Sequence, residues 1–249
     1  MMMKNRITLV TGASRGIGAA TAGLLAAHGA IVAVNYFNSE PAALKVVDEI
    51  VSAGGKAAAF QADVRDKAQV EQMVAEIGSL FGPIDTLISN AAISFPIKPF
   101  VEFQWPEFEA KLTGELKATF FCCQAVIPEM MKRRYGCIIA VSSGLSRNPA
   151  AGFCAHSTAK SGLDALMKSL AGELGIYGIR VNVVAPGLTN TDATAFLPMA
   201  HKEAMAGITP LRRNGEPIDV AGAILMIASD HSRFITGNYL PVSGGLVML

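Results

Sequence analysis

Short runs of β-branched and other apolar residues alternate with longer helical patterns along the whole chain. The runs typical of strands are residues 7–10, 31–34, 57–60, 84–89, 137–142, 180–184 and 238–242. Between them, apolar residues recur at helical spacing, as from Val70 to Phe81 and from Leu163 to Leu174. Because strand and helix take turns, the strands should lie parallel, with helices on both faces of the sheet. We therefore expect an α/β fold with one doubly wound sheet of about seven strands.

Length and composition narrow the class of protein. A chain of 249 residues suits one large domain, spanning residues 1–249. A net charge of +1 without a basic block gives no reason to expect a nucleic-acid partner. No apolar run approaches the ~18 residues of a membrane span, and a secretory leader is not evident, so we expect a cytoplasmic protein without membrane contact. The four cysteines and four histidines are scattered, so no metal site is expected.

The first strand leads straight into a glycine-rich turn, which reads Thr11-Gly12-Ala13-Ser14-Arg15-Gly16-Ile17-Gly18. Glycine tolerates positive φ and lets the backbone approach a ligand closely. A helix that begins near Gly16 directs free N–H groups and the positive end of its dipole toward that ligand, which suits a pyrophosphate. A tight connection between strand and helix, with no ligand, is compatible with the same residues.

The longest stretch without clear periodicity runs over residues 187–216. Loops of this length in a compact domain are usually functional. Doubly wound sheets bind ligands beyond the carboxyl ends of their strands. We therefore expect residues 187–216 to form a lid over a ligand site, with an amphipathic helix at residues 197–205.

The order of these motifs resembles the short-chain dehydrogenase/reductase family, which has a Rossmann-type fold. The glycine turn matches the cofactor turn of the family, and Ser143 lies at the family's usual spacing before position 156. Residues 212–220 and 236–245 resemble the branch of 3-oxoacyl carrier-protein reductases. The other matching motifs are Asp63-Val64, Pro186-Gly187 with Thr189, and Ser89-Asn90-Ala91-Ala92, where the family has Asn-Asn-Ala-Gly.

The resemblance implies a nicotinamide cofactor, and the residues favour NADP(H) over NAD(H). Residues 35–39, which follow the second strand, hold no carboxylate to accept from a ribose 2′-OH. Arg15 is suited to bind a 2′-phosphate instead. The expected cofactor-binding residues are Gly12, Ser14, Arg15, Gly16, Ile17, Gly18, Asn35, Asp63, Val64, Asn90, Ala91, Lys160, Pro186, Gly187 and Thr189.

Two of the four catalytic positions implied by the family are changed. Ser143 matches the serine that binds the substrate carbonyl, and Lys160 matches the lysine that holds the nicotinamide ribose. His156 stands where the family has its proton-donating tyrosine. Counting back from the end of the long fourth helical segment, Glu115 takes the place of the asparagine. The expected catalytic set is therefore Ser143, His156, Lys160 and Glu115.

An imidazolium at position 156 is a competent acid near neutral pH, since histidine has an unperturbed pKa of about 6.5. Its outer nitrogen ends about 1.5–2 Å short of a tyrosine oxygen, so a water would have to bridge the gap. A carboxylate at Glu115 beside Lys160 would favour the protonated ring, whereas burial would oppose it. The alternative is that His156 is only tolerated at a lapsed site. Two other residues also have a purely structural alternative. Ser143 could cap the end of the fifth strand, and Asn90 could serve only a turn.

Three functions follow. The first is an NADP(H)-dependent oxidoreductase for a carbonyl or activated alkene, with His156 or solvent supplying the proton. The second is a non-redox cyclase, dehydratase or isomerase, and the third is a binding subunit without activity. Residues 93–100, 144–153 and 188–197 are mostly apolar, with Lys98 and Arg147 added, which suits a bulky carbonyl compound or an acyl thioester as the small-molecule substrate.

The resemblance also implies a homo-oligomer, a dimer or a tetramer, formed through helices at about residues 105–133 and 152–177. Apolar side chains on the first of these helices exceed what one buried stripe requires. They are Phe108, Leu112, Leu116, Phe120 and Phe121.

Overall fold

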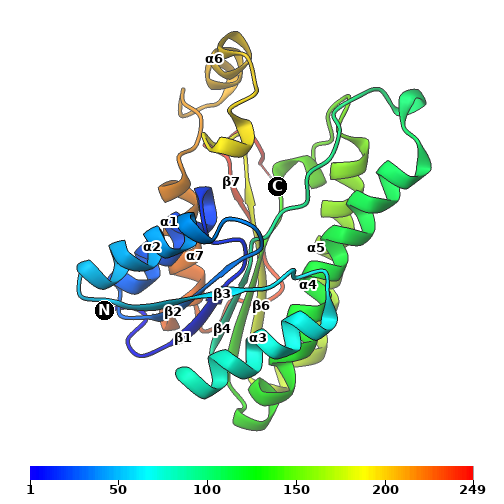
Figure 1. Cartoon of the computed structure of the whole chain (residues 1–249). Helices are drawn as coiled ribbons and strands as arrows, with labels where there is room; N and C mark the ends of the chain where they lie inside the picture. The colour runs from blue at the N-terminus through cyan, green and yellow to red at the C-terminus, as the bar shows by residue number, and fades with distance from the viewer. Residues whose placement is uncertain (249) are drawn as a thin grey trace.

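Seven parallel strands form one sheet in residues 1–248, the part of the chain that the computed structural model describes (Figure 1). They are β1 (Ile7–Val10), β2 (Ile31–Tyr36), β3 (Lys56–Gln61), β4 (Thr86–Ser89), β5 (Gly136–Val141), β6 (Ile179–Pro186) and β7 (Tyr239–Val242). Their order across the sheet is β3-β2-β1-β4-β5-β6-β7. The predicted α/β class and doubly wound parallel sheet are confirmed.

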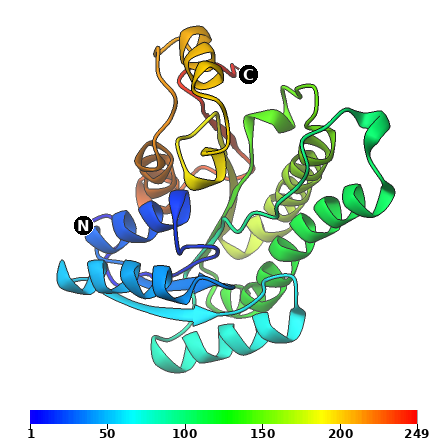
Figure 2. The same ribbon diagram turned by 45° about the horizontal axis from the view of Figure 1, so that its top comes forward.

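Helices cover both faces of the sheet (Figures 1 and 2). On one face lie α1 (Gly16–Ala27), α2 (Glu40–Ser52) and α7 (Pro217–Ala228). On the other lie α3 (Lys67–Leu80), α4 (Trp105–Arg133) and α5 (Cys154–Leu174). The short helix α6 (Met199–Ile208) stands beyond the carboxyl ends of the strands (Figure 1). None of the helices in residues 1–248 is both long and apolar enough to cross a membrane.

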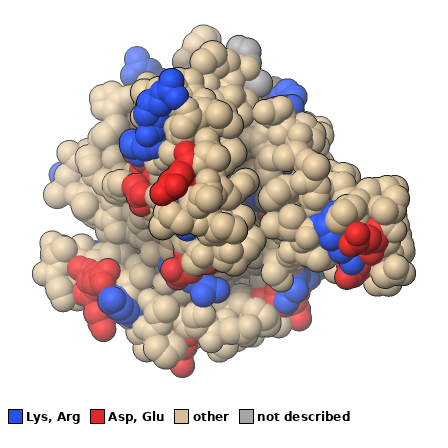
Figure 3. Space-filling model, turned by 90° about the horizontal axis from the view of Figure 1, so that it is seen from above, with Lys and Arg blue, Asp and Glu red and all other residues tan. Residues whose placement is uncertain are grey.

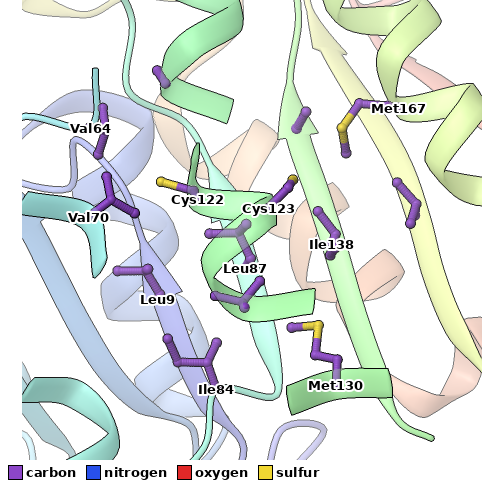
Figure 4. Close-up of a cluster of buried hydrophobic side chains, with 14 of the residues drawn as sticks. Leu9, Val64, Val70, Ile84, Leu87, Cys122, Cys123, Met130, Ile138 and Met167 are labelled. Atoms are coloured by element: carbon purple, nitrogen blue, oxygen red, sulfur yellow. The ribbon is translucent and has the colours of Figure 1, made fainter. Parts of the chain in front are cut away.

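The larger of two apolar cores fills the space between the sheet and the helices α3, α4 and α5 (Figure 4). Leu9, Leu87 and Ile138 extend into it from adjacent strands, and Cys122 and Cys123 face it from α4. Burial raises the pKa of the Cys122 and Cys123 thiols, so both side chains remain uncharged and pack as small apolar groups. The backbone of α4 is thereby held against the strands whose ends form the site.

The long helix α4 has a defined start and end. Gln104 and Glu107 form a capping box at its first turn, and Pro106 occupies the turn where a missing N–H costs nothing. Arg134 terminates it in the left-handed conformation. The predicted range of residues 105–133 is therefore confirmed.

The strand order reverses between β1 and β4, which are neighbours although two strands separate them in the sequence. The crossovers that leave these two strands turn to opposite faces, and a crevice opens between them at the carboxyl edge. Above this edge, residues 187–216 contain the short 3₁₀ turn η4 (Asp192–Thr194) and α6. Pro198 precedes α6, so this helix begins later than the predicted residue 197.

Candidate active site

The glycine turn after β1 packs directly on the segment that follows β4. Gly12 has φ +60°, and a Cβ there would lie 2.8 Å from the Cα of Ala91. A Cβ on Gly18 would lie 2.5 Å from the carbonyl oxygen of Gly12. Real Cβ atoms do not approach other atoms this closely, so both positions require glycine. The turn can therefore bring its backbone close to whatever fills the crevice.

Hydrogen bonds hold this turn to the end of β4. The Thr11 hydroxyl accepts the backbone N–H groups of Asn90 and Ala91 at 2.9 and 3.0 Å. The Asn90 amide in turn donates to the carbonyl oxygens of Thr11 and Gly12, at 2.9 and 3.1 Å. Asn90 therefore joins two separate segments at the predicted switch point and does more than close its own turn.

Asn35, at the end of β2, supports the same turn from the opposite side. Its Oδ1 accepts the Gly12 N–H at 3.1 Å, and its amide nitrogen donates to carbonyl oxygens at the end of β3, including that of Ala62 at 3.1 Å. The side chain is only 2% exposed. Its polar atoms are thus occupied inside the protein, and Asn35 fixes the position of Gly12 instead of offering a free group to a ligand.

The first turn of α1 opens onto the crevice without a side-chain cap, so its N–H groups remain available to an anion. Arg15, at the N-cap, is exposed. Asp63 forms a two-oxygen ion pair with Arg65, whose guanidinium holds the pKa of Asp63 below its usual value.

The other predicted cofactor positions lie around the same edge. Ser14 and Ile17 are half-buried on the turn, and Val64 is buried beside Asp63. Pro186 ends β6, Gly187 follows it, and the hydroxyl of Thr189 donates to the Gly187 carbonyl oxygen.

Three charged side chains meet beneath the crevice. The Lys160 ammonium lies 2.5 Å from Oε1 of Glu115, and the Lys111 ammonium lies 2.5 Å from Oε2 of the same carboxylate. Lys160 also donates to the Val141 carbonyl oxygen at 2.7 Å, at the end of β5. Burial alone would raise the pKa of Glu115, but the ammonium groups of Lys160 and Lys111 outweigh it and hold this pKa at about 2. The carboxylate is therefore ionised at neutral pH.

His156 lies close to this charged cluster on α5. Its ring stacks on Phe95, with centroids 4.6 Å apart and an interplanar angle of 18°. Burial lowers the pKa of His156 to about 3, with further lowering by Lys111 and Lys160 and partial opposition from Glu115. The imidazole is therefore neutral at pH 7. Glu115 raises the pKa of His156, as expected, but burial and the two lysines lower this pKa by more.

The tautomer of His156 follows from its surroundings. Nδ1 is buried and has no hydrogen-bond partner among the described residues. Buried N–H donors without a partner are rare in proteins, and buried acceptors without one are less rare, which favours the tautomer that leaves Nδ1 unprotonated. We therefore assign the proton to Nε2, which makes that nitrogen a hydrogen-bond donor.

Ser143 follows β5, two residues beyond the carbonyl that holds Lys160. Its Oγ accepts the Leu145 N–H at 3.2 Å, so it caps the short turn η2 (Gly144–Ser146). Its carbonyl oxygen accepts the Tyr239 hydroxyl at 3.0 Å. The capping role is therefore present, and it leaves the hydroxyl proton of Ser143 available to a ligand oxygen.

The two cations in the predicted substrate segments are already engaged. Lys98 lies 2.6 Å from Glu107, and the Arg147 guanidinium lies 3.7 Å from the buried Asp164. Seen from above, charged side chains gather in small separate groups on a mostly uncharged face (Figure 3). The lysine and the arginine of these segments are therefore both paired with carboxylates.

No motif in the sequence marks Lys111, Phe95 or the linking role of Thr11. The i, i+4 spacing of Lys111 and Glu115 is visible in the sequence, but such pairs are common on solvent-facing helix surfaces. Only burial distinguishes this pair, and burial depends on how α4 packs. Phe95 lies in an irregular segment, so no periodic pattern marks it.

The glycine turn, the uncapped first turn of α1 and the lysine beside β5 define a dinucleotide-binding enzyme of the doubly wound class. A family model described as enoyl-(acyl carrier protein) reductase matches residues 12–247. The chain belongs to the short-chain dehydrogenase/reductase family, and it is accordingly an oxidoreductase.

Individual relatives cover almost the whole chain. It is 39% identical to the 3-oxoacyl-[acyl-carrier-protein] reductase FabG of Staphylococcus epidermidis, over 98% of this chain and 100% of the relative. It is 37% identical to a 3alpha-hydroxysteroid dehydrogenase of Mediterraneibacter gnavus, over 98% of each. Among solved structures, a blue fluorescent protein from a metagenomic library in complex with NADPH superposes with a TM-score of 0.91 at 34% identity, covering 100% of both chains.

The lowered pKa of His156 predicts a specific loss of stability in mild acid. The unfolded chain takes up a proton near pH 6.5, but the folded chain does so only near pH 3. The stabilisation that comes from keeping His156 neutral in the folded chain is therefore fully present above about pH 6.5. It is lost as the pH falls toward 3. We expect the free energy of unfolding of the wild type to fall by up to about 1.4 kcal/mol per pH unit more than that of His156→Phe.

Urea unfolding between pH 7.5 and 5 measures this difference, in a range where most carboxylates do not yet titrate. His231→Phe, which changes an exposed histidine, serves as the matched control and should run parallel to the wild type. Parallel curves for the wild type and His156→Phe would contradict the assignment of a neutral ring.

Proposed function

We propose that the protein is an NADP(H)-dependent reductase for a carbonyl group, or for an alkene activated by a carbonyl, in a bulky apolar compound or acyl thioester. The observation that carries the proposal is the meeting of Lys160, His156 and Glu115 at the end of β5, across the crevice from the glycine turn. Membership of the family and the NADPH in complex with the similar solved protein support the choice of reaction and cofactor.

The residues at the carboxyl edge fit a dinucleotide. Gly12 and Gly18 leave room that a Cβ would fill, and the uncapped first turn of α1 offers N–H groups to a pyrophosphate. Arg15 is exposed at this turn and suits a 2′-phosphate. The amides of Asn35 and Asn90 act on the turn itself. When bound, NADPH supplies the hydride for the reduction.

The side chains of the site act on the substrate oxygen. Ser143 donates its hydroxyl proton in a hydrogen bond to this oxygen, and His156 donates the N–H of Nε2 to it, directly or through a water. Lys160 adds positive charge beneath both. Because the His156 ring is neutral at pH 7, it stabilises the developing negative charge as a hydrogen-bond donor and not as an imidazolium acid. Solvent then supplies the proton that completes the product.

Two apolar segments flank the crevice and suit a bulky substrate. Ile97 and Phe100, which precede α4, and Phe196, which precedes α6, expose large parts of their side chains. The two segments stand apart on either side of the carboxyl edge (Figures 1 and 2). We propose residues 187–216 as a lid that closes this gap, within a single domain of residues 1–249.

Cofactor choice provides the first test. We expect NADP(H) to bind at least about tenfold more tightly than NAD(H), equivalent to about 1.4 kcal/mol, because Arg15 forms charge-assisted hydrogen bonds with a 2′-phosphate. Isothermal titration calorimetry measures both affinities. Arg15→Ala should weaken the binding of NADP(H) and leave that of NAD(H) nearly unchanged. Equal or tighter binding of NAD(H) by the wild type would contradict this assignment.

His156→Ala tests the chemistry. Removing one donor to a developing oxyanion lowers turnover by about 10²–10³. We expect a loss of this size in kcat, with little change in NADPH affinity, when NADPH oxidation is followed with an apolar ketone or a 3-oxoacyl thioester. The pH profile of the wild type should lack a limb near pH 6.5, since the pKa of His156 is about 3.

Other results would select the other mechanisms and functions. A limb near pH 6.5 that disappears in His156→Ala would indicate an imidazolium donor. Equal turnover in the two proteins would exclude a role for His156. Product formed without NADPH oxidation would favour a non-redox reaction, and the absence of any turnover, together with tight association to a partner, would favour a binding subunit.

We also propose a homo-oligomer, a dimer or a tetramer, built on α4 and α5. Phe120 is 43% exposed on α4, and Leu116 and Phe121 are half-buried on the same helix, which leaves apolar surface for a second copy. Light scattering at micromolar concentration should give a mass of at least twice 26.1 kDa. Phe120→Lys should shift the mass toward the monomer, whereas Lys117→Met on the same helix should not. A wild-type mass of one chain would refute the assembly.

A further inference from the structure

Lys111 is an ammonium group buried in the interior, with 1% of its surface exposed. Burial of a charge costs several kcal/mol unless it is paired and hydrogen-bonded. Lys111 has both kinds of partner. It lies 2.5 Å from Oε2 of Glu115, and it donates to the carbonyl oxygen of Ile93 at 2.8 Å. Its position is therefore fixed on one side by α4 and on the other by the segment after β4.

Glu115 divides its carboxylate between two lysines. Oε1 faces Lys160 on α5, and Oε2 faces Lys111 on its own helix. Burial lowers the pKa of Lys111, and the Glu115 carboxylate opposes this shift. With both lysines protonated, the three groups together carry two positive charges and one negative charge, so one unit of positive charge is left over. Without Lys111, both carboxylate oxygens would be free to engage Lys160, and the buried pair would be neutral.

The contacts of the two lysines show which ammonium group still has an N–H donor for a ligand. Lys111 directs its donors to Glu115 and Ile93, and its ammonium lies 4.8 Å from the centre of the Phe95 ring, which also stacks on His156. Lys160 donates to Glu115 and to Val141, and an ammonium has three N–H groups. The third is the one that remains for a ligand in the crevice.

We propose that Lys111 is a positioning residue for Lys160. By occupying one oxygen of Glu115, it prevents the carboxylate from capturing Lys160 completely, and it leaves Lys160 a positive charge and a donor for the nicotinamide ribose. This inference rests on the proposed function, because it assigns Lys160 to the cofactor. It also explains why a carboxylate can replace a neutral amide at position 115 without cancelling the charge of Lys160.

The test compares the wild type with Lys111→Met, Glu115→Gln and the double variant. Lys111→Met leaves an anion that competes for Lys160, whereas Glu115→Gln leaves two buried cations without an anion. The double variant leaves Lys160 alone with a neutral neighbour. Isothermal titration calorimetry with NADP⁺ gives the dissociation constant of each protein, and thermal unfolding without ligand shows whether each is folded.

We expect each single variant to bind NADP⁺ at least about tenfold more weakly than the wild type, and the double variant to recover most of that loss. Lys117→Met, an exposed lysine on the same helix, should bind like the wild type. Loss of packing at Lys111 would not be repaired by removing a carboxylate, so recovery separates positioning by charge from a merely structural role. A double variant as weak as Lys111→Met would overturn the proposal.

The binding and unfolding measurements together separate this inference from the proposed function. A wild type that binds no NADP⁺ would refute the cofactor assignment and with it the role of Lys111 toward Lys160. If NADP⁺ binds and Lys111→Met binds it as tightly as the wild type, only the role of Lys111 is refuted. Should a single variant fail to fold, a folded double variant that binds NADP⁺ supports the proposal, and a double variant that also fails to bind refutes it.

Discussion

The site depends on one electrostatic constraint: an ammonium group can be buried only beside an anion. Lys160 and Lys111 approach the interior from two helices, and Glu115 is the carboxylate that both contact. Lys160 also binds the end of β5 through Val141, and Lys111 binds the segment after β4 through Ile93. The cluster therefore connects α4 and α5 to the carboxyl edge of the sheet, where the crevice lies.

A second, uncharged network holds the opposite wall of the crevice. Thr11, Asn35 and Asn90 hydrogen-bond to the backbone around Gly12, so the glycine turn is fixed from the ends of β2 and β4. Because these side chains are engaged with the backbone, the groups left for a ligand are the N–H groups of α1 and the side chain of Arg15. One wall thus offers the backbone donors of α1 and the side chain of Arg15, and the other carries the side chains to which we assign the reaction.

Much of the fold could be predicted from the sequence, because a buried parallel strand is a short continuous apolar run. The predicted residues 7–10 coincide with β1, and residues 105–133 coincide with α4. Less of the site could be predicted from the sequence. No pattern distinguishes a buried Lys111 from an exposed one, and none shows that the side chain of Asn35 points into the protein. The charge state of His156 depends on burial and on two lysines brought together only by folding.

The changes at positions 115 and 156 have different consequences. A neutral amide at position 115 beside Lys160 would leave a net charge of +1. Glu115 together with Lys111 and Lys160 leaves the same net charge. The added charges of Lys111 and Glu115 therefore cancel and do not change the net charge that faces an anionic cofactor. His156 is not compensated in this way. Its ring is neutral, its outer nitrogen lies nearer to the backbone than a tyrosine oxygen would, and the surrounding cations oppose its protonation. The proposed charge balance would therefore preserve the binding of an anionic cofactor. In the proposed mechanism, the source of the proton is the point at which this site departs from the other members of its family.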